Sequence, residues 1–243
     1  DSLTRFGVQT SLKDTSFEVY ETTPGGSLTE TLIGGNDNWK ENGQRYRIAM
    51  TGIAPEFDNE SALFIDLQPG TYTLNANSEQ GAGIALIEVY GTEPKAIGES
   101  IAAGSSEGNI VQEFTILNAA LEATNLTAVL NGPGPFTKFA PTDQAFLGTY
   151  TQADLAELLA DDGDKEDDLT TLTGILLKHV VGGGILSKML VEDETTTVTS
   201  LMDTEIDIQL NDGSITVNNA NVIEGDLTFT NGVLHVIDAV LEF

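Results

Sequence analysis

Two histidines, His179 and His235, are the residues of this chain best suited to acid–base chemistry near neutral pH. His179 could serve as a general base for Ser187 or Thr173. The chain has no G-x-S-x-G motif, however, and nothing in the spacing defines an acid that would orient the imidazole. His179 also falls on an apolar helical stripe. The pattern therefore favours two hydrogen-bonded core histidines over a catalytic site.

Metal chemistry is limited by the absence of cysteine, which removes thiolate zinc ligands, disulfide bonds and thiol nucleophiles together. An acidic segment, residues 161–168, is the best calcium candidate because hard cations bind several oxygen ligands on a flexible loop. The segment lies between two predicted helices and lacks the EF-hand spacing, and a well-solvated loop would have the same composition. The candidate calcium ligands are Asp162, Asp164, Glu166 and Asp168.

Exposed aromatic rings can stack on sugar faces, and the first hundred residues contain Trp39, Tyr46, Tyr72 and Tyr90. Aromatic residues favour strands, so most of these rings are expected to pack in a β core. Trp39 is the expected exception because it follows three polar, turn-forming residues. The paired carboxylates of a glycosidase give no comparable signal, since a pair can always be found among 38 acidic residues.

The charge balance excludes several classes of partner. The chain has 38 acidic and 10 basic residues and a net charge of −28. Residues 1–100 carry 15 acidic and 6 basic groups (net −9), and residues 101–243 carry 23 and 4 (net −19). Such a surface repels phosphate backbones and anionic lipid headgroups, so we expect neither nucleic acid nor an acidic membrane as partner. The charge fits solubility in a salt-rich or marine environment, and it could also collect divalent cations.

The first part of the chain, residues 1–100, is predicted to be an all-β domain of the sandwich type. Short alternating apolar runs recur between turn signals, as they do in sandwiches. One hairpin is predicted at Pro69 and Gly70, whose types suit a type II turn. Residues 98–108, rich in Gly, Ser and Ala, are predicted to be a linker. The predicted strands lie at residues 17–20, 28–33, 46–50, 62–67, 71–74 and 84–90.

The remainder, residues 105–243, alternates helical and strand patterns and is predicted to be an α+β domain. Helices are predicted from Asn109, from near Thr151 and from about Leu169, the first two with polar caps. Strands are predicted at residues 206–210 and 215–217, and Asn231-Gly232 marks a hairpin that leads into a buried strand. The apolar helical stripes are Ile110, Phe114, Leu117 and Leu121; Leu155, Leu158 and Leu159; and Leu172, Leu176 and His179.

Three segments of this second domain resemble the signature motifs of the fasciclin family. Residues 134–146 (GPFTKFAPTDQAF) are similar to the first signature, and residues 176–181 (LLKHVV) stand where the family has its central histidine motif. Residues 217–222 and 231–241 are similar to the second signature. The order and spacing match, so the resemblance implies a fasciclin-type fold over residues 105–243. Within the first signature, Thr142 and Asp143 are expected to cap a short helix.

The resemblance implies a role in adhesion to cells, matrix or glycans. Relatives implicated in adhesion commonly carry a tyrosine before the central histidine, and this chain has Lys178 there. The candidate binding residues are therefore Lys178 and His179, together with Trp39 in the first domain. That first domain is similar, over shorter stretches, to a β-sandwich module that accompanies large exported bacterial proteins.

We therefore predict a non-catalytic adhesion module, secreted or on a bacterial cell surface, that binds extracellular polysaccharide or a surface glycoconjugate or protein. Calcium is its candidate cofactor. An extracellular hydrolase acting on polysaccharide or its ester links is the first alternative, favoured if His179 lies exposed in a cleft beside a serine and a carboxylate. A structural spacer is the second, favoured if neither domain has a concave or aromatic surface. No apolar stretch is long enough to cross a bilayer.

Overall fold

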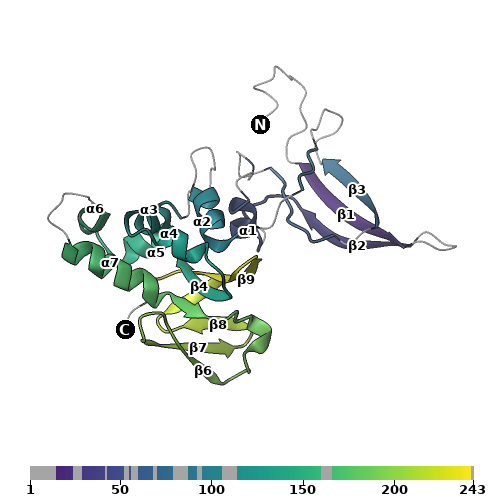
Figure 1. Ribbon diagram of the computed structural model, residues 1–243. Helices are drawn as coiled ribbons and strands as arrows, with labels where there is room; N and C mark the ends of the chain where they lie inside the picture. The colour runs from purple at the N-terminus through teal and green to yellow at the C-terminus, as the bar shows by residue number, and fades with distance from the viewer. Residues whose placement is uncertain are drawn as a thin grey trace, which may run out of the picture. The chain divides into compact units, whose positions relative to one another are not determined.

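The chain forms two compact units in a computed structural model (Figure 1). The first unit comprises residues 1–92 and 107–110, and the second comprises residues 93–106 and 111–243. None of the helices in the described parts of the chain has the length and apolar character to span a membrane. The structure describes residues 15–23, 29–41, 43–51, 55, 60–67, 70–78, 87–91, 95–105, 114–159 and 166–241.

The second unit is built on a seven-stranded sheet with the strand order β5-β4-β10-β9-β8-β7-β6. β10 pairs in parallel with β4, and the other neighbouring strands are antiparallel. The strands are β4 (Phe136–Pro141), β5 (Val180–Gly182), β6 (Thr195–Thr199), β7 (Glu205–Asn211), β8 (Ser214–Val217), β9 (Ala220–Phe229) and β10 (Gly232–Ile237).

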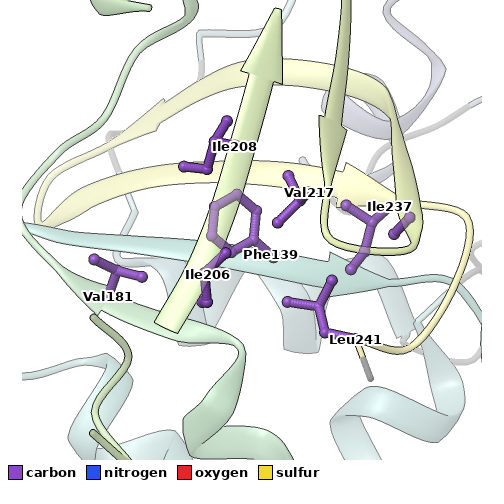
Figure 2. Close-up of a cluster of buried hydrophobic side chains, with 8 residues drawn as sticks. Phe139, Val181, Ile206, Ile208, Val217, Ile237 and Leu241 are labelled. Atoms are coloured by element: carbon purple, nitrogen blue, oxygen red, sulfur yellow. The ribbon is translucent and has the colours of Figure 1, made fainter. Parts of the chain in front are cut away.

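This sheet curls until its two outer strands approach each other. Val181 at β5 forms an isolated bridge with Ser200, just after β6, and the Leu201 backbone N–H donates to the Val180 carbonyl at 2.8 Å. The curl encloses an apolar core because alternate residues of each strand point inward. Figure 2 shows seven members of that core, Phe139, Val181, Ile206, Ile208, Val217, Ile237 and Leu241.

Helices gather on one side of the second unit, and β6, β7 and β8 form the other side (Figure 1). The helices bury apolar stripes, and the stripe of α3 consists of Leu117, Ala120 and Leu121. The helices are α2 (Ile97–Ser105), α3 (Thr115–Ala123), α4 (Leu126–Leu130), α5 (Asp143–Thr149), α6 (Gln152–Leu159) and α7 (Glu166–Lys178), with a 3₁₀ turn, η2, at Ser187–Met189.

Side chains cap the starts of α3, α5 and α6 in this unit. The Thr142 hydroxyl accepts from the Ala145 N–H at 3.2 Å, which confirms the predicted cap of α5. Asp143 instead caps α3, since its carboxylate accepts from the Ile116 N–H at 2.8 Å and the Thr115 N–H at 3.2 Å. The expectation that Asp143 serves its own helix is therefore wrong, and one short segment fixes two helices.

The predictions for the second unit are confirmed for most elements. The helices near Thr151 and Leu169 are α6 and α7, and the hairpin at Asn231 joins β9 to β10. At the start of α6, the Thr151 N–H donates to the Asp154 carboxylate at 2.9 Å and the Asp154 N–H donates to the Thr151 hydroxyl at 3.2 Å. The predicted cap at Asn109 lies outside the described residues.

The predicted linker at residues 98–108 is wrong for residues 98–105, which belong to helix α2. Ile97 and Ile101, one helical turn apart, are both fully buried. The Asn231 side chain accepts from the Ile97 N–H, and the Asn131 side chain accepts from the Glu99 N–H, both at 3.1 Å. Gly98 permits this contact, because a Cβ there would lie 2.5 Å from the Asn131 Oδ1 atom.

The first unit contains an antiparallel three-stranded sheet in the order β2-β1-β3. Its strands are β1 (Thr15–Thr23), β2 (Thr29–Asn36) and β3 (Thr71–Ser78), and a short helix, α1 (Arg45–Ala49), follows β2. This is the only sheet among the described residues of the unit. The predicted sandwich of two sheets is therefore not present in that part of the chain.

Three strand predictions in the first unit are wrong, wholly or over the residues that the structure describes. Residues 46–50 are helical over most of their length, because a short apolar run suits either a buried helix or a buried strand and periodicity cannot separate them. Residues 62–67 form no strand, and Thr71 begins a strand that pairs with β1 instead. Pro69, at the predicted turn, lies outside the described residues, as do residues 84–86 of the last predicted strand, and 87–90 are not a strand.

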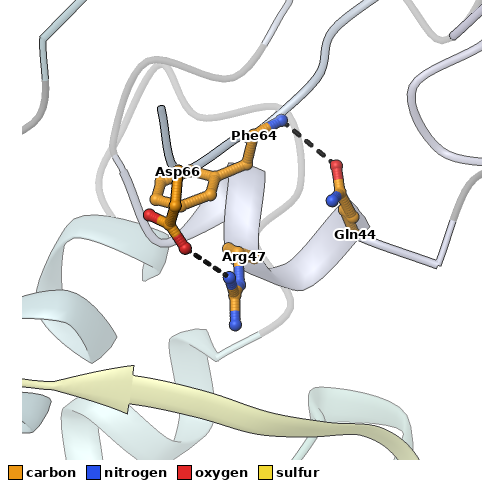
Figure 3. A network of polar contacts seen from close by, with 4 residues as sticks. All are labelled: Gln44, Arg47, Phe64 and Asp66. Carbon is orange, nitrogen blue, oxygen red and sulfur yellow. Dashed lines mark hydrogen bonds and ion pairs between the residues drawn. The ribbon is translucent and has the colours of Figure 1, made fainter. Parts of the chain in front are cut away.

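Side chains at the start of α1 and within it contact residues 64–66, in the segment predicted as a hairpin strand (Figure 3). The Phe64 backbone N–H donates to the Gln44 side-chain oxygen at 3.1 Å, a contact that a sheet ladder would otherwise supply. The Arg47 guanidinium lies over the Phe64 ring, 5.2 Å from its centroid, and 3.9 Å from the Asp66 carboxylate. Phe64 is thus fixed from both its backbone and its ring.

Candidate functional site

His179, the central residue of the fasciclin motif, is a core histidine as predicted. Its side chain is 1% exposed, its Nδ1 atom lies 2.7 Å from the Ile175 carbonyl, and its Nε2 atom accepts from the Leu241 N–H at 2.9 Å. Burial and, to a smaller extent, the nearby Lys138 together lower the pKa of His179 to about 3. The imidazole is therefore neutral and structural, and its burial gives no support to the predicted contact with a ligand.

The second histidine and the candidate nucleophile Ser187 also belong to a structural network. The Ser187 hydroxyl donates to the Asp226 carboxylate, and the Asp226 N–H donates to His235 Nδ1 at 3.3 Å. The other ring nitrogen, Nε2, lies 2.9 Å from the Ile185 carbonyl. The histidine therefore cannot take a proton from Ser187, and in the described part of the chain neither histidine is placed as a general base for a hydroxyl nucleophile.

Trp39 is fully buried, so the prediction that its ring is exposed for sugar stacking is wrong. The polar residues before it do form a turn, in which the Asn36 side chain donates to the Asn38 carbonyl at 3.3 Å. The Trp39 N–H then donates to the Glu60 carbonyl at 3.0 Å, which ties the residue to another segment. The Lys40 amine lies 5.6 Å from the ring centroid. The turn therefore directs the ring inward rather than into solvent.

The calcium ligands stay a prediction. Asp162 and Asp164 lie outside the described residues, and Glu166 and Asp168 are placed only as backbone in the first turn of α7. Within the parts of the chain that are described, no group of three or more acidic or histidine side chains could hold a metal ion.

The second unit has a concave site, a groove of about 380 Å³ between the end of α3 and α7. Thr124 and Asn125 line it at the end of α3, and Thr170 and Thr173 line it on α7. Met202, in the turn after β6, closes one side. These residues are far apart in sequence, which is why no motif identified the groove.

The lining combines hydroxyl and amide groups with apolar surface and has no charged side chain among the residues that form it. Its apolar part consists of Ala123, Leu169 and Met202, and the last of these is 43% exposed. Asn125 adopts the left-handed conformation (φ 56°), which an asparagine tolerates, and this lets the chain turn between α3 and α4. The chain has a net charge of −28, so the uncharged lining of this groove differs from the acidic character of the chain as a whole.

Gly174 keeps the floor of the groove open. A Cβ added there would meet the Met202 Cε atom at 3.7 Å, so any larger side chain would fill the space. A glycine inside a helix costs about 1 kcal/mol relative to alanine, and an open groove is a physical reason to tolerate that cost. The predicted binding residue Lys178 lies one turn further along the same helix and is half-buried.

Sequence reasoning missed an unusual buried residue, Lys138. It lies in the middle of β4 with its side chain fully buried, and its Nζ atom has no hydrogen-bond partner. Burial lowers the pKa of Lys138 to about 7. No sequence signal marked it, because the burial of every position after Phe136 follows from the place of β4 between β5 and β10 in the sheet.

Comparisons with known proteins agree with the fold. Protein sll1483 of Synechocystis sp. is 37% identical over 164 residues, which cover 65% of this chain and 86% of that protein. Human periostin is 29% identical over 130 residues, which cover 54% of this chain and 15% of periostin. The solved FAS1 domain pair of the insect cell adhesion molecule Fasciclin I has a TM-score of 0.50 at 18% identity and covers 94% of this chain and 68% of that one.

The family follows from the extent of the match. A model of the fasciclin domain matches residues 112–243, more than half of the chain, and all three predicted signature segments fall within it. This chain belongs to the fasciclin domain family.

Proposed function

We propose that this protein is a non-catalytic extracellular adhesion module whose fasciclin unit binds a neutral glycan or matrix segment in the groove between α3 and α7. The groove itself is the observation that carries the proposal. Its volume of about 380 Å³ falls within the range of about 300–1,000 Å³ that small-ligand sites occupy.

The lining favours a neutral, polyhydroxylated ligand. Thr124, Asn125, Thr170 and Thr173 offer hydroxyl and amide groups for hydrogen bonds, and the Met202 side chain offers an apolar surface for the carbon face of a sugar ring. An anionic ligand would be repelled by the net charge of the chain, and a cationic one would be drawn to carboxylates outside the groove. A neutral ligand is neither repelled by the net charge nor drawn to carboxylates outside the groove.

The family context supports adhesion rather than catalysis. The structural neighbour Fasciclin I is a cell adhesion molecule, and the relative from Synechocystis aligns with 65% of this chain. A hydrolase would need His179 exposed beside a serine and a carboxylate, whereas His179 is buried and bonded to backbone at both nitrogens. A pure spacer is disfavoured by the presence of the concave groove. We place the protein outside the cell, secreted or attached to a bacterial surface.

The test is calorimetric titration of neutral oligosaccharides, with sulfated ones as negative controls. Gly174→Phe fills the groove and is expected to abolish binding, whereas Gly174→Ala adds a single methyl group 3.7 Å from Met202 and should bind within a few fold of wild type. Equal binding by all three proteins would exclude the groove. Parallel runs with calcium and with a chelator test the acidic segment, and Lys178→Ala tests the lysine near the end of the groove.

A further inference from the structure

The last strand of the sheet in the second unit, β6, has one backbone edge that no described residue pairs along most of its length. β6 pairs with β7 on its other side, and the Ser200 N–H donates to the Thr204 carbonyl at 2.8 Å where the two strands join. In an antiparallel pair, hydrogen-bonded and non-bonded positions alternate. Counting back from Ser200, Val198 and Thr196 bond to β7, and the backbone groups of Thr197 and Thr195 point to the open edge.

The next strand confirms this alternation. The Asn218 N–H donates to the Asp207 carbonyl at 2.9 Å, and the Asp207 N–H donates to the Asn218 side chain, so Asp207 turns its backbone toward β8. Asp207 is the cross-strand partner of Thr197. A residue of β7 that bonds to β8 cannot bond to β6, so Thr197 presents its N–H and its carbonyl outward.

Over its five residues, β6 has no lysine, no proline and no bulge, three of the features that proteins use to prevent strand addition. Edge strands are usually protected by lysine, proline, a bulge or a covering segment. β6 has the sequence Thr-Thr-Thr-Val-Thr, made only of β-branched residues, and its register with β7 is regular. The edge closes only at its end, where Ser200 bridges to Val181 of β5. The open stretch therefore matches a short extended peptide.

The acidic residues around β6 indicate that a peptide bound there would carry basic side chains. Glu192, Asp193 and Glu194 precede β6, and Asp203 and Glu205 follow it, all of them exposed. A second copy of this chain would bring the same carboxylates against these and would be repelled. A segment with lysine or arginine on the face shared with Glu205 would be attracted, and β-branched residues on its other face would pack beside the half-buried Val198.

We propose that β6 is a docking edge for an extended, basic segment of a partner protein, which joins the sheet as an additional strand. The backbone groups of Thr195 and Thr197 supply the hydrogen bonds, and the flanking carboxylates supply long-range attraction and selectivity. This site is separate from the groove and does not depend on the proposed glycan ligand.

The experiment uses a fluorescent seven-residue peptide that alternates lysine and valine, titrated with the full chain at low salt. A matched peptide with N-methyl groups on the amides that face β6 keeps the charge but loses the hydrogen bonds. We expect at least tenfold weaker binding of the methylated peptide, weaker binding of the parent peptide at higher salt, and slower amide exchange at Thr195 and Thr197 in the complex. Equal binding of the two peptides would overturn strand addition, as would no binding of the parent at millimolar concentration.

Thr197→Pro is the matched protein variant. Its missing N–H faces the open edge rather than β7, so the ladder with β7 is kept and proline is tolerated. It is expected to lose peptide binding at least tenfold while Gly174→Phe, which fills the groove, binds the peptide like wild type. If Thr197→Pro folds and binds the peptide unchanged, the proposal is wrong, and the methylated peptide decides the matter if the variant does not fold.

Discussion

Replacement of Lys138 by methionine is expected to stabilise the second unit. Lys138 lies on β4 opposite Val180 of β5 and Leu234 of β10, both buried, and its amine has no hydrogen-bond partner. A charged amine in that position loses its hydration without compensation. Methionine has a similar length and shape, fills the same space and carries no charge. The cost of burying the amine is therefore removed with little change in packing.

The magnitude follows from the pKa. The lysine pKa is 10.5 in the unfolded chain and about 7 in the folded one, so about 3.5 pH units separate the two states. At about 1.36 kcal/mol per unit, the wild type is penalised by about 4 kcal/mol at pH 7. Between pH 7 and 10.5 the unfolded chain holds a proton that the folded chain has lost, so wild-type stability rises with pH in this window. The advantage of Lys138→Met should therefore shrink by about 4 kcal/mol from pH 6 to pH 10.

The assay is urea unfolding of both proteins at pH 6, 8 and 10, followed by far-UV circular dichroism. Fluorescence of Trp39, the single tryptophan, reports the first unit and so separates the two transitions. Lys178→Met is the control, because that lysine is half-buried at a helix end and its replacement should change stability by no more than about 1 kcal/mol. A Lys138→Met protein that is less stable at pH 7, or whose advantage is the same at pH 6 and 10, would refute the reasoning.

Three further predictions concern buried polar side chains. His179→Gln should make the fold less sensitive to acid. The pKa of His179 is about 3 in the folded chain and 6.5 in the unfolded one, so the unfolded wild type binds a proton first as the pH falls. Between pH 6.5 and 3, urea titrations should therefore show that the wild type loses up to about 4 kcal/mol more stability than the variant. Asn231→Ala removes bonds to three backbone groups and should cost about 3 kcal/mol by thermal unfolding. Thr142→Ala and Asp143→Ala should each cost about 1 kcal/mol, and their double mutant should lose the sum because they cap different helices; a clearly smaller loss would contradict the assignment.

The sequence predicted most of the second unit because its local signals agree with its packing. The stripe through Leu172, Leu176 and His179 buries one face of α7, and the alternation at Ile206 and Ile208 buries one face of β7. The family signatures added the order of these elements. Periodicity and motif therefore pointed to the same fold, and the structure has it.

The wrong predictions concern residues whose type is explained by a contact with a distant part of the chain. Gly98 reads as flexible linker, but its role is to let the Asn131 side chain approach the start of α2. The polar turn before Trp39 reads as a surface loop, but the turn directs the ring into the core. A residue's type indicates the local structure that it favours. The conformation at Gly98 and Trp39, however, depends on partners about twenty or more residues away in the sequence. Pattern alone cannot supply such partners.

The candidate sites were invisible to sequence reasoning for the same reason. The groove brings together Thr124, Gly174 and Met202, and the open edge of β6 becomes apparent only once the strand order is known. The motif residue His179, by contrast, stands out in the sequence, and its imidazole accepts a hydrogen bond from the Leu241 N–H in the core. In this domain, the motif residue His179 belongs to the core, whereas both proposed binding sites consist of residues outside the three signature segments.

The two proposed sites are joined by one short, rigid turn. Ser200 ends β6, and its hydroxyl accepts from the N–H groups of Met202 and Thr204, both at 3.2 Å, and lies 2.6 Å from the Thr204 hydroxyl. The turn therefore fixes Met202, a wall of the groove, relative to the edge of β6. A glycosylated partner with a basic extended segment could contact both sites at once, and the second contact would then form at high effective concentration. Two individually weak sites arranged in this way would give firm attachment to a surface that displays both features, and weak binding to either feature alone.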